Sequence, residues 1–239
     1  MAGTWFISDL HLDPGRPAVT RAFSEFLDAH RHADALYILG DFFEAWIGDD
    51  DDAPLGQQVA SWLADFSAAG PALYLMVGNR DFLLGEDFAR RAGATLLPDP
   101  SVIDLYGHRV LLMHGDSLCT GDTDYLQFRA MARSPAWQAE VLARPLAERR
   151  ALAAQLRSMS SESNSNKAED IMDVTPREVE AALREHGVDC LIHGHTHRPD
   201  HHRHANGERW VLGDWHDSAL LLKASSGSTL SFEKLNIAK

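Results

Sequence analysis

The sequence predicts an α/β fold with a largely parallel sheet, because short apolar runs alternate with helical patterns along its first part. Three runs are almost continuously apolar, as strands buried on both faces are: Trp5–Ile7, Leu36–Leu39 and Leu73–Val77. Between these runs, apolar side chains recur at helical spacing in residues 19–30 and 59–66. A β-α-β-α-β order of this kind is typical of strands that lie side by side in parallel.

Residues 121–175 show no strand pattern and are rich in Ala, Leu, Arg and Glu. A helical pattern there is interrupted at Pro135 and Pro145 and dissolves into the polar run Ser158–Asn166. We therefore predict that this segment is a helical insertion, or lid, between two strands of the core. The core itself is expected to comprise residues 1–120 and 176–239.

The segments on either side of the insertion return to core patterns. Before it, Val102–Leu105 and Val110–Met113 predict a hairpin. After it, Thr175-Pro176-Arg177-Glu178 has the pattern of a capping box with proline at the first helical position, and the helix should end near Gly187. A strand is expected over Val188–Ile192, followed by antiparallel strands from Arg203 to Lys234 that turn at Asn206-Gly207.

The composition is that of a soluble globular protein, since 45% of the 239 residues are hydrophobic and 24% are charged. The formal net charge of −13 disfavours a protein that binds the backbone of nucleic acids. The two cysteines, Cys119 and Cys190, predict buried free thiols in a reducing compartment. No apolar stretch has the length of a signal peptide core or a membrane helix, so we expect a cytoplasmic protein that can still touch a membrane surface.

Five short polar motifs each follow a predicted strand directly, at the end where open α/β sheets place their ligand crevice. They are Asp9-Leu10-His11, Gly40-Asp41, Gly78-Asn79-Arg80-Asp81, His114-Gly115-Asp116 and His193-Gly194-His195-Thr196-His197. Each motif alone is more often a cap, a turn or a structural histidine. Together they supply oxygen and imidazole ligands without thiolates, which favours Mn, Fe, Zn or Mg.

This succession of motifs resembles the calcineurin-like metallophosphoesterases. The resemblance implies an αββα sandwich of two sheets flanked by helices, with two divalent metal ions, which we expect to be Mn²⁺. Carried over residue by residue, one metal would be bound by Asp9, His11 and His197, the other by Asn79, His114 and His195, and Asp41 would bridge them. Two adjacent cations can activate water and hold phosphoryl oxygens during in-line displacement. For His193 two roles stay open: it orients a ligand or merely ends the strand.

Arg80 departs from most members of this superfamily, which have histidine at that position as a candidate acid for the leaving group. A guanidinium does not donate its proton at neutral pH, but it binds phosphate oxygens bidentately. The site therefore suits a leaving group that needs no protonation, such as the phosphate of a broken pyrophosphate bond. The alternative is that Arg80 only forms an ion pair with Asp81 or Asp116.

The longer pattern of Gly40–Asp50, with Gly78–Leu83 and His114–Asp116, resembles the UDP-2,3-diacylglucosamine pyrophosphohydrolases of lipid A biosynthesis. The resemblance implies hydrolysis at the α-phosphorus to UMP and 2,3-diacylglucosamine 1-phosphate (lipid X), by a monomer at the cytoplasmic face of the inner membrane. It also implies catalytic roles for Asn79, Arg80 and His195. The implied substrate-binding residues are Asn79, Arg80, Asp122, Ser160, Asn164, Lys167 and His195.

The insertion has a local excess of positive charge, with six arginines and two glutamates between Arg129 and Arg157. We expect this basic element to meet a diphosphate or anionic lipid head groups. Its apolar residues are expected in part to pack on the core and in part to line a groove for acyl chains. In contrast, we expect Asp49–Asp52 to be a solvated loop and His201, His202 and His204 to lie at the surface.

Two other functions remain open at this stage. The first is a nucleotide or protein phosphatase with the same two-metal scaffold, which activity on soluble aryl phosphates would support. The second is a catalytically silent scaffold of this fold, which the absence of bound metal and of hydrolase activity would support. Arg80 and the insertion argue against the first alternative, and the complete ligand set argues against the second.

Overall fold

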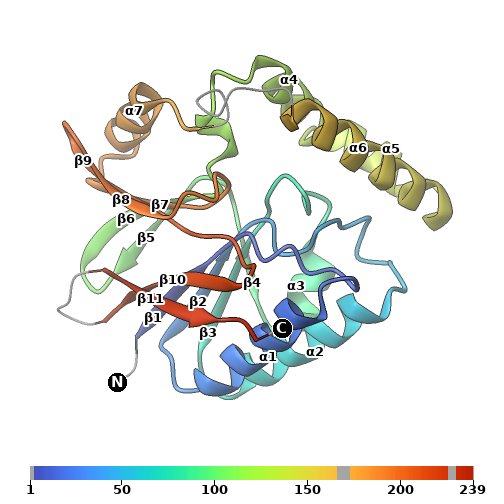
Figure 1. Cartoon of the computed structure of the whole chain (residues 1–239), viewed down its shortest axis with the longest axis horizontal. Helices are drawn as coiled ribbons and strands as arrows, with labels where there is room; N and C mark the ends of the chain where they lie inside the picture. The colour runs from blue at the N-terminus through green and yellow to red at the C-terminus, as the bar shows by residue number, and fades with distance from the viewer. Residues whose placement is uncertain (1–2, 166–172, 226–229, 239) are drawn as a thin grey trace.

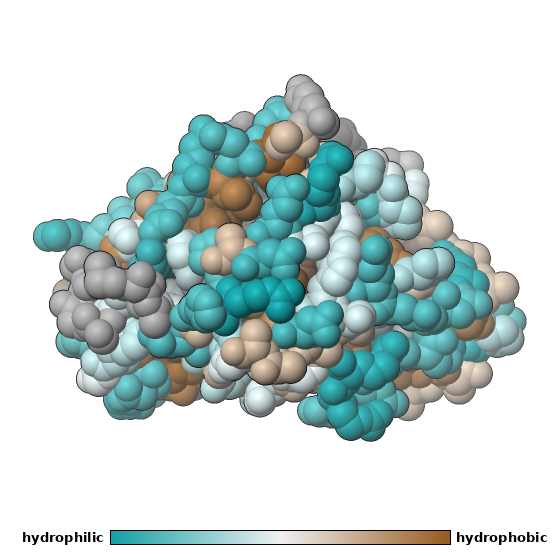
Figure 2. All heavy atoms as spheres, turned by 90° about the horizontal axis from the view of Figure 1, so that it is seen from below, coloured by the Kyte–Doolittle hydropathy of each residue, from teal (hydrophilic) through white to brown (hydrophobic). Residues whose placement is uncertain are grey.

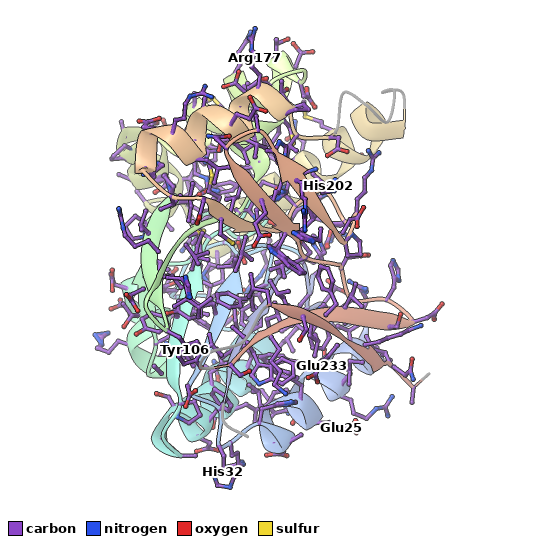
Figure 3. The ribbon with its side chains drawn as sticks, turned by 90° about the vertical axis from the view of Figure 1, so that its left-hand side faces the viewer. Glu25, His32, Tyr106, Arg177, His202 and Glu233 are labelled. Carbon is purple, nitrogen blue, oxygen red and sulfur yellow. The ribbon has the colours of Figure 1, made fainter. Side chains whose placement is uncertain are left out.

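Two mixed β-sheets stack face to face in the computed structural model, which describes residues 3–165, 173–225 and 230–238. Helices cover the outer face of each sheet, as Figure 1 shows. Figure 3 shows the layers from the side: the helix of Arg177 at the top, the sheet of His202 beneath it, the strand of Glu233 next and the helix of Glu25 at the bottom. The α/β prediction and the two-sheet sandwich are confirmed.

The six-stranded sheet has the order β11-β10-β1-β2-β3-β4. Its four parallel strands are β1 (Thr4–Ile7), β2 (Ala35–Leu39), β3 (Ala72–Met76) and β4 (Thr95–Leu97), and β10 (Ser218–Ala224) and β11 (Ser231–Asn236) complete it in antiparallel. Its helices are α1 (Pro17–Ala29), α2 (Pro54–Ala68) and the short α3 (Glu86–Ala92). The first three strands and first two helices confirm the predicted pattern, whereas α3 and β4 were not predicted.

The five-stranded sheet has the order β5-β6-β7-β9-β8. Its strands are β5 (Ser101–Leu105), β6 (His108–Met113), β7 (Cys190–His193), β8 (Asp200–His204) and β9 (Gly207–Val211). The predicted β5–β6 hairpin is confirmed. The predicted antiparallel pairing after residue 203 is confirmed for β8 with β9, which turn near Asn206-Gly207, and for β10 with β11. The sequence did not indicate that β9 also pairs with β7 in parallel or that β10 belongs to the other sheet.

The core has three apolar clusters because the central strands are buried on both faces. On β2, Leu36 and Ile38 pack toward α1 and α2, while Tyr37 and Leu39 point into the space between the sheets. The third cluster lies between the five-stranded sheet and α7 (Pro176–His186). These layers fix the ends of β1, β2, β3, β6 and β7, where the polar motifs begin.

The insertion forms three helices, α4 (Thr123–Ala132), α5 (Pro135–Leu142) and α6 (Leu146–Ser165), which lie apart from the sheets at the upper right of Figure 1. The breaks at Pro135 and Pro145 are confirmed, but α6 continues into the polar run that we expected to be irregular. Helix α7 begins at Pro176 as predicted. However, the Thr175 hydroxyl lies 2.7 Å from that of Thr120 and does not cap the helix, so the capping box is wrong.

The surface on the side of α1 and α2 is shown in Figure 2, where hydrophilic residues are spread over the face with hydrophobic patches between them. Within the described residues, no helix is long and apolar enough to cross a membrane.

Candidate active site

The loops after β1, β2, β3, β6 and β7 bring the predicted metal ligands together. Asp9, His11 and His197 form one group, and Asp41, His114 and His195 form another. In each group the candidate ligand atoms all lie within 4.8 Å of one another. The second group also includes Asn79, whose Oδ1 lies 2.9 Å from both His114 Nε2 and His195 Nδ1.

Asp41 lies between the two groups, as a bridging ligand would. Its Oδ2 is 3.9 Å from His11 Nε2, and its Oδ1 is 3.7 Å from His114 Nε2. Within the first group, His11 Nε2 lies 3.3 Å from His197 Nε2, and His197 Nε2 lies 3.4 Å from Asp9 Oδ1. The two groups also contact each other directly, since His195 N donates to Asp9 Oδ2 over 2.9 Å. This geometry supports the assignment of Asp41 that the resemblance implied.

The backbone of these loops is bent into a conformation that side-chain-bearing residues rarely adopt. A positive φ, between 49° and 70°, occurs at five of the predicted ligands: Asp9, His11, Asp41, His195 and His197. Such conformations cost roughly 1–3 kcal/mol each and persist where the surrounding structure holds them. The rigid strand ends therefore impose the backbone shape that aims the ligands at one another.

Two glycines of the motifs allow the loops to approach closely. A Cβ at Gly78 would lie 2.1 Å from Asp41 Oδ1, and one at Gly194 would lie 2.3 Å from Ser8 Oγ. Any side chain at either position would push Asp41 or the Asp9 loop out of place. These contacts explain why glycine stands before Asn79 and before His195.

Hydrogen bonds orient the predicted ligands and leave the atoms that face the site available to bind a cation. His114 Nδ1 donates to Leu39 O over 2.9 Å, which leaves the Nε2 lone pair facing the site. Asp9 Oδ2 accepts from Ser8 Oγ and from His195 N. Asp9 Oδ1 is buried and has no hydrogen-bond partner among the described residues. A buried carboxylate oxygen without a donor fits a cation, so the residues present suit divalent metals.

The electrostatics of the site link cation binding to loss of a proton. Burial alone would lower the pKa of His114, but the carboxylates of Asp41, Asp116 and Asp9 raise it to about 9. Burial lowers the pKa of His193 to about 3 and that of His195 to about 4. A divalent cation would displace the proton of His114, because a ligand must be deprotonated to bind.

His193 lies behind the ligand groups and ends β7. Its Nδ1 donates to Gly194 O over 2.8 Å, and Arg209 Nη1 lies 3.4 Å from its Nε2. It also supports the neighbouring loop, because a Cβ at Gly115 would lie 2.6 Å from His193 Nδ1. Of the two roles left open, this favours the structural one.

The Arg80 side chain lines a cavity and forms no ion pair with the described residues. Its backbone N–H donates to Asp41 Oδ1 over 2.8 Å, which places it next to the metal ligands. The alternative ion pair with Asp81 or Asp116 is wrong here. Asp81 accepts hydrogen bonds from the backbone of Phe42 and Gly78. Asp116 instead binds the hydroxyl of Tyr125 and the guanidinium of Arg129.

A cavity of about 270 Å³ runs from the ligand groups under the insertion. Asn79, Arg80 and Asp122 line it near the ligands. Further along, its walls are apolar side chains of the insertion, among them Phe128, Trp137, Leu152 and Leu156. Some apolar residues of the insertion thus line a groove as expected. Ala132 is buried away from the cavity, whereas Val141 belongs to the core and also lines the cavity wall.

The positive charges of the insertion are used differently from our expectation. Each of the six arginines forms an ion pair with a described carboxylate. The pairs are Arg129 with Asp99 and Asp116, Arg133 with Asp116, Arg144 with Glu140, Arg149 with Asp50, Arg150 with Asp51 and Asp52, and Arg157 with Glu44. Five of these six arginines pair with residues outside the insertion. The basic element therefore attaches the insertion to the acidic core, and its availability for lipid head groups was overestimated.

The run Asp49–Asp52 is a loop in which Asp50 and Asp52 are exposed, as expected, but its carboxylates also have protein partners. Asp49 accepts hydrogen bonds from the backbone of Gly85 and Phe88 and so holds the start of α3. The next three aspartates bind Arg149 and Arg150. The histidines of β8 are only partly exposed, since the ring of His201 stacks on Trp210 at a centroid distance of 4.0 Å.

The remaining predicted substrate residues lie on the insertion. Asp122 begins α4, and its carboxylate accepts a hydrogen bond from Tyr125 N over 3.1 Å. Ser160 and Asn164 fall on α6 with side chains outside the described part, and Lys167 lies outside the described residues altogether.

Sequence reasoning missed two residues that contact the ligands. The ring of Tyr125 stacks on His195 at 6.0 Å, and Glu44 Oε2 lies 3.0 Å from His11 Nδ1. Glu44 lies in the quoted pattern Gly40–Asp50 and Tyr125 in the predicted insertion, but only the folded chain shows these contacts.

Comparison with known proteins agrees with this geometry. Residues 3–199 match the family of calcineurin-like phosphoesterases. A UDP-2,3-diacylglucosamine hydrolase of Cellvibrio japonicus is 60% identical over 93% of this chain and 95% of its own length, and one of Marinobacter nauticus is 53% identical over 98% of both chains. Among solved structures, a novel archaeal phosphodiesterase shares the fold with a TM-score of 0.51 at 11% identity, covering 98% of this chain and 99% of its own. The chain therefore belongs to the calcineurin-like phosphoesterases and, within them, to the family of UDP-2,3-diacylglucosamine hydrolases.

Proposed function

We propose that the chain hydrolyses the pyrophosphate bond of UDP-2,3-diacylglucosamine at the α-phosphorus, giving UMP and 2,3-diacylglucosamine 1-phosphate, as a step of lipid A biosynthesis. The observation that carries this proposal is a cavity that joins Asn79 and Arg80 to apolar side chains of the insertion. A substrate with a diphosphate next to two acyl chains matches a cavity that is polar at one end and apolar at the other.

Two divalent cations, proposed to be Mn²⁺, would be held by the two ligand groups. Asp9, His11 and His197 would hold one, Asn79, His114 and His195 the other, with Asp41 between them. When bound, such cations activate water as the nucleophile and neutralise phosphoryl charge. The low pKa of His195, caused first by its removal from water, keeps its imidazole neutral and able to act as a ligand.

Arg80 would bind the diphosphate oxygens beside these ligands. Its backbone is fixed by the hydrogen bond to Asp41, so the guanidinium extends into the cavity from a constrained position. The leaving phosphate is stable as an anion, since its second ionisation has a pKa near 6. The site consequently needs positive charge and not a proton donor, which is what arginine supplies.

The insertion, residues 121–175, would act as a lid over the acyl chains. Among the described residues of the insertion, the large apolar side chains of Met131, Leu142 and Met159 are exposed to solvent. We propose that the enzyme is a cytoplasmic monomer and that these residues contact the cytoplasmic surface of the inner membrane, where the substrate resides. Because the insertion's arginines are paired with carboxylates, apolar contact would contribute more to this association than charge.

The test compares UDP-2,3-diacylglucosamine with unacylated UDP-glucosamine in the presence of Mn²⁺. We expect efficient turnover of the acylated substrate alone, loss of activity on chelation, and recovery when Mn²⁺ is restored. In heavy-oxygen water the label should enter UMP. Equal turnover of the unacylated substrate would contradict the role of the cavity, and label in the lipid phosphate alone would contradict attack at the α-phosphorus.

A further inference from the structure

Glu44 is the carboxylate that reaches both a metal ligand and the insertion. It follows β2 by five residues, and its backbone N–H donates to Leu12 O over 3.1 Å, which fixes it against the loop of Asp9 and His11. A bridge between Leu12 and Phe43 reinforces this contact. The Glu44 side chain is only 17% exposed and lies in the wall of the cavity.

The two oxygens of Glu44 have different partners. Oε2 lies 3.0 Å from His11 Nδ1, and Oε1 lies 3.0 Å from Nη2 of Arg157 on α6. The opposite ring nitrogen of His11, Nε2, faces Asp41 and His197. The 3.0 Å contact between Glu44 Oε2 and His11 Nδ1 is an ion-pair distance and not an aligned hydrogen bond, because the buried His11 Nδ1 has no hydrogen-bond partner among the described residues. A proton on Nδ1, next to the Glu44 carboxylate, would leave the Nε2 lone pair directed at the ligand groups, and this arrangement favours metal binding.

We propose that Glu44 is a positioning residue that orients His11 for metal binding with one oxygen and holds helix α6 over the cavity through Arg157 with the other. The proposal rests on the proposed function, since it takes His11 as a metal ligand. The Arg80 side chain lines the same cavity wall as Glu44. One carboxylate thus connects the ligand groups, the insertion and the site proposed for the diphosphate.

The first experiment measures Mn²⁺ affinity by calorimetry on purified, metal-stripped protein, without substrate. Glu44→Met removes both acceptors and should weaken Mn²⁺ binding by about 10–100-fold, as loss of a partner behind a ligating histidine typically does. Glu44→Gln keeps the shape and one neutral acceptor, so it should restore part of the affinity. Arg157→Gln leaves the contact with His11 in place and should change the affinity by less than about threefold.

The second experiment measures hydrogen exchange of the amides of residues 150–157 in the same variants. Both Glu44→Met and Arg157→Gln should speed exchange by about two- to fivefold, as expected for loss of a partly exposed ion pair. The double variant should exchange no faster than the faster single variant. Arg144→Gln is the matched control, because Arg144 is similarly exposed but pairs with Glu140 inside the insertion, and its exchange should not change.

The outcomes separate this proposal from the proposed function. If wild-type protein binds Mn²⁺ but Glu44→Met and Glu44→Gln bind it as tightly, the role on His11 is overturned. Unchanged exchange in both Glu44→Met and Arg157→Gln overturns the role on α6. Should Glu44→Met not fold, Glu44→Gln decides alone, with wild-type affinity and exchange as the overturning result. A wild-type chain that binds no divalent cation overturns the proposed function itself.

Discussion

The ligand groups and the insertion both use charged residues, but they hold them in different ways. Asp9, Asp41 and His114 are at most 2% exposed, and each is hydrogen-bonded to the backbone of a neighbouring loop. The side chains of Arg150 and Arg157 on the insertion are each 47% exposed and bind only carboxylates. Buried groups held by backbone cannot shift without loss of the fold, whereas exposed ion pairs contribute only about 0–1 kcal/mol each.

This difference suggests a division of labour between the two regions. The strand ends provide a fixed geometry, which the chemical step requires to within fractions of an ångström. Parts of the insertion are attached by exposed ion pairs, such as that of Arg150, although Arg149 is buried and donates to Ile47 O of the core. We expect the apolar wall of the cavity to select the substrate. We call the strand ends that carry the predicted metal ligands and Arg80 the ligand edge. Variants at the ligand edge should therefore alter kcat, and variants in the cavity wall should alter KM.

The largest expected effect of this kind concerns Arg80. Arg80→Ala should lower kcat by about 10²–10³, as removal of a preorganised electrostatic donor does, while metal content stays that of the wild type. Arg80→His should not restore activity, because an acid at this position has nothing to protonate. Steady-state kinetics measures kcat for the two variants, and metal analysis of the purified proteins measures their metal content. Arg90→Ala, which removes an exposed arginine paired with Asp87, is the control. A kcat within about threefold of wild type would show that Arg80 has no part in the chemical step.

A smaller effect is expected in the cavity wall. Leu156 lines the cavity, whereas Leu142 is exposed and does not. Leu156→Glu should raise KM for the diacylated substrate by about tenfold or more, because a charge replaces part of an apolar wall. Leu142→Glu should leave KM nearly unchanged, because the Leu142 side chain lies outside the cavity wall. If both variants raise KM equally, the insertion's exposed surface and not the cavity binds the substrate.

The ligand edge could be predicted from the sequence because its chemistry restricts residue types and because parallel strands end at one edge of a sheet. The motifs from Asp9 to His197 therefore converge as expected. The left-handed backbone of five of these residues could not be predicted, since aspartate and histidine adopt it only where the fold imposes it.

The insertion was predictable in its helices but not in its contacts. Its prolines mark the helix starts locally, at Pro135 and next to Pro145. Two of its arginines, however, pair with aspartates about a hundred positions earlier, Arg149 with Asp50 and Arg150 with Asp51 and Asp52. Single-sequence patterns contain no information on such distant pairs. A basic segment and an acidic run were consequently interpreted as independent surfaces, although each neutralises the other.

The smallest expected effect sharpens the distinction between ligands and the residues behind them. His193 has a pKa of about 3 because burial and the Arg209 guanidinium disfavour its charged form, against 6.5 in the unfolded chain. Below pH 6.5 the unfolded chain therefore binds a proton that the folded chain does not. His193 thus makes the free energy of unfolding fall as pH drops from 6.5 toward 3, with a slope of at most about 1.4 kcal/mol per pH unit.

His193→Gln should flatten that slope, because the amide can donate to Gly194 O and accept from Arg209 without titrating. Urea unfolding of metal-stripped protein at several pH values between 4 and 7 measures the difference between variant and wild type, and removing metal excludes losses from cation release. Mn²⁺ affinity of the variant at pH 7.5 should stay within about threefold of the wild type, since His193 is not placed among the ligands. A variant with an unchanged pH slope would show that His193 is not the group that titrates, and a large loss of Mn²⁺ affinity would place it behind a ligand after all.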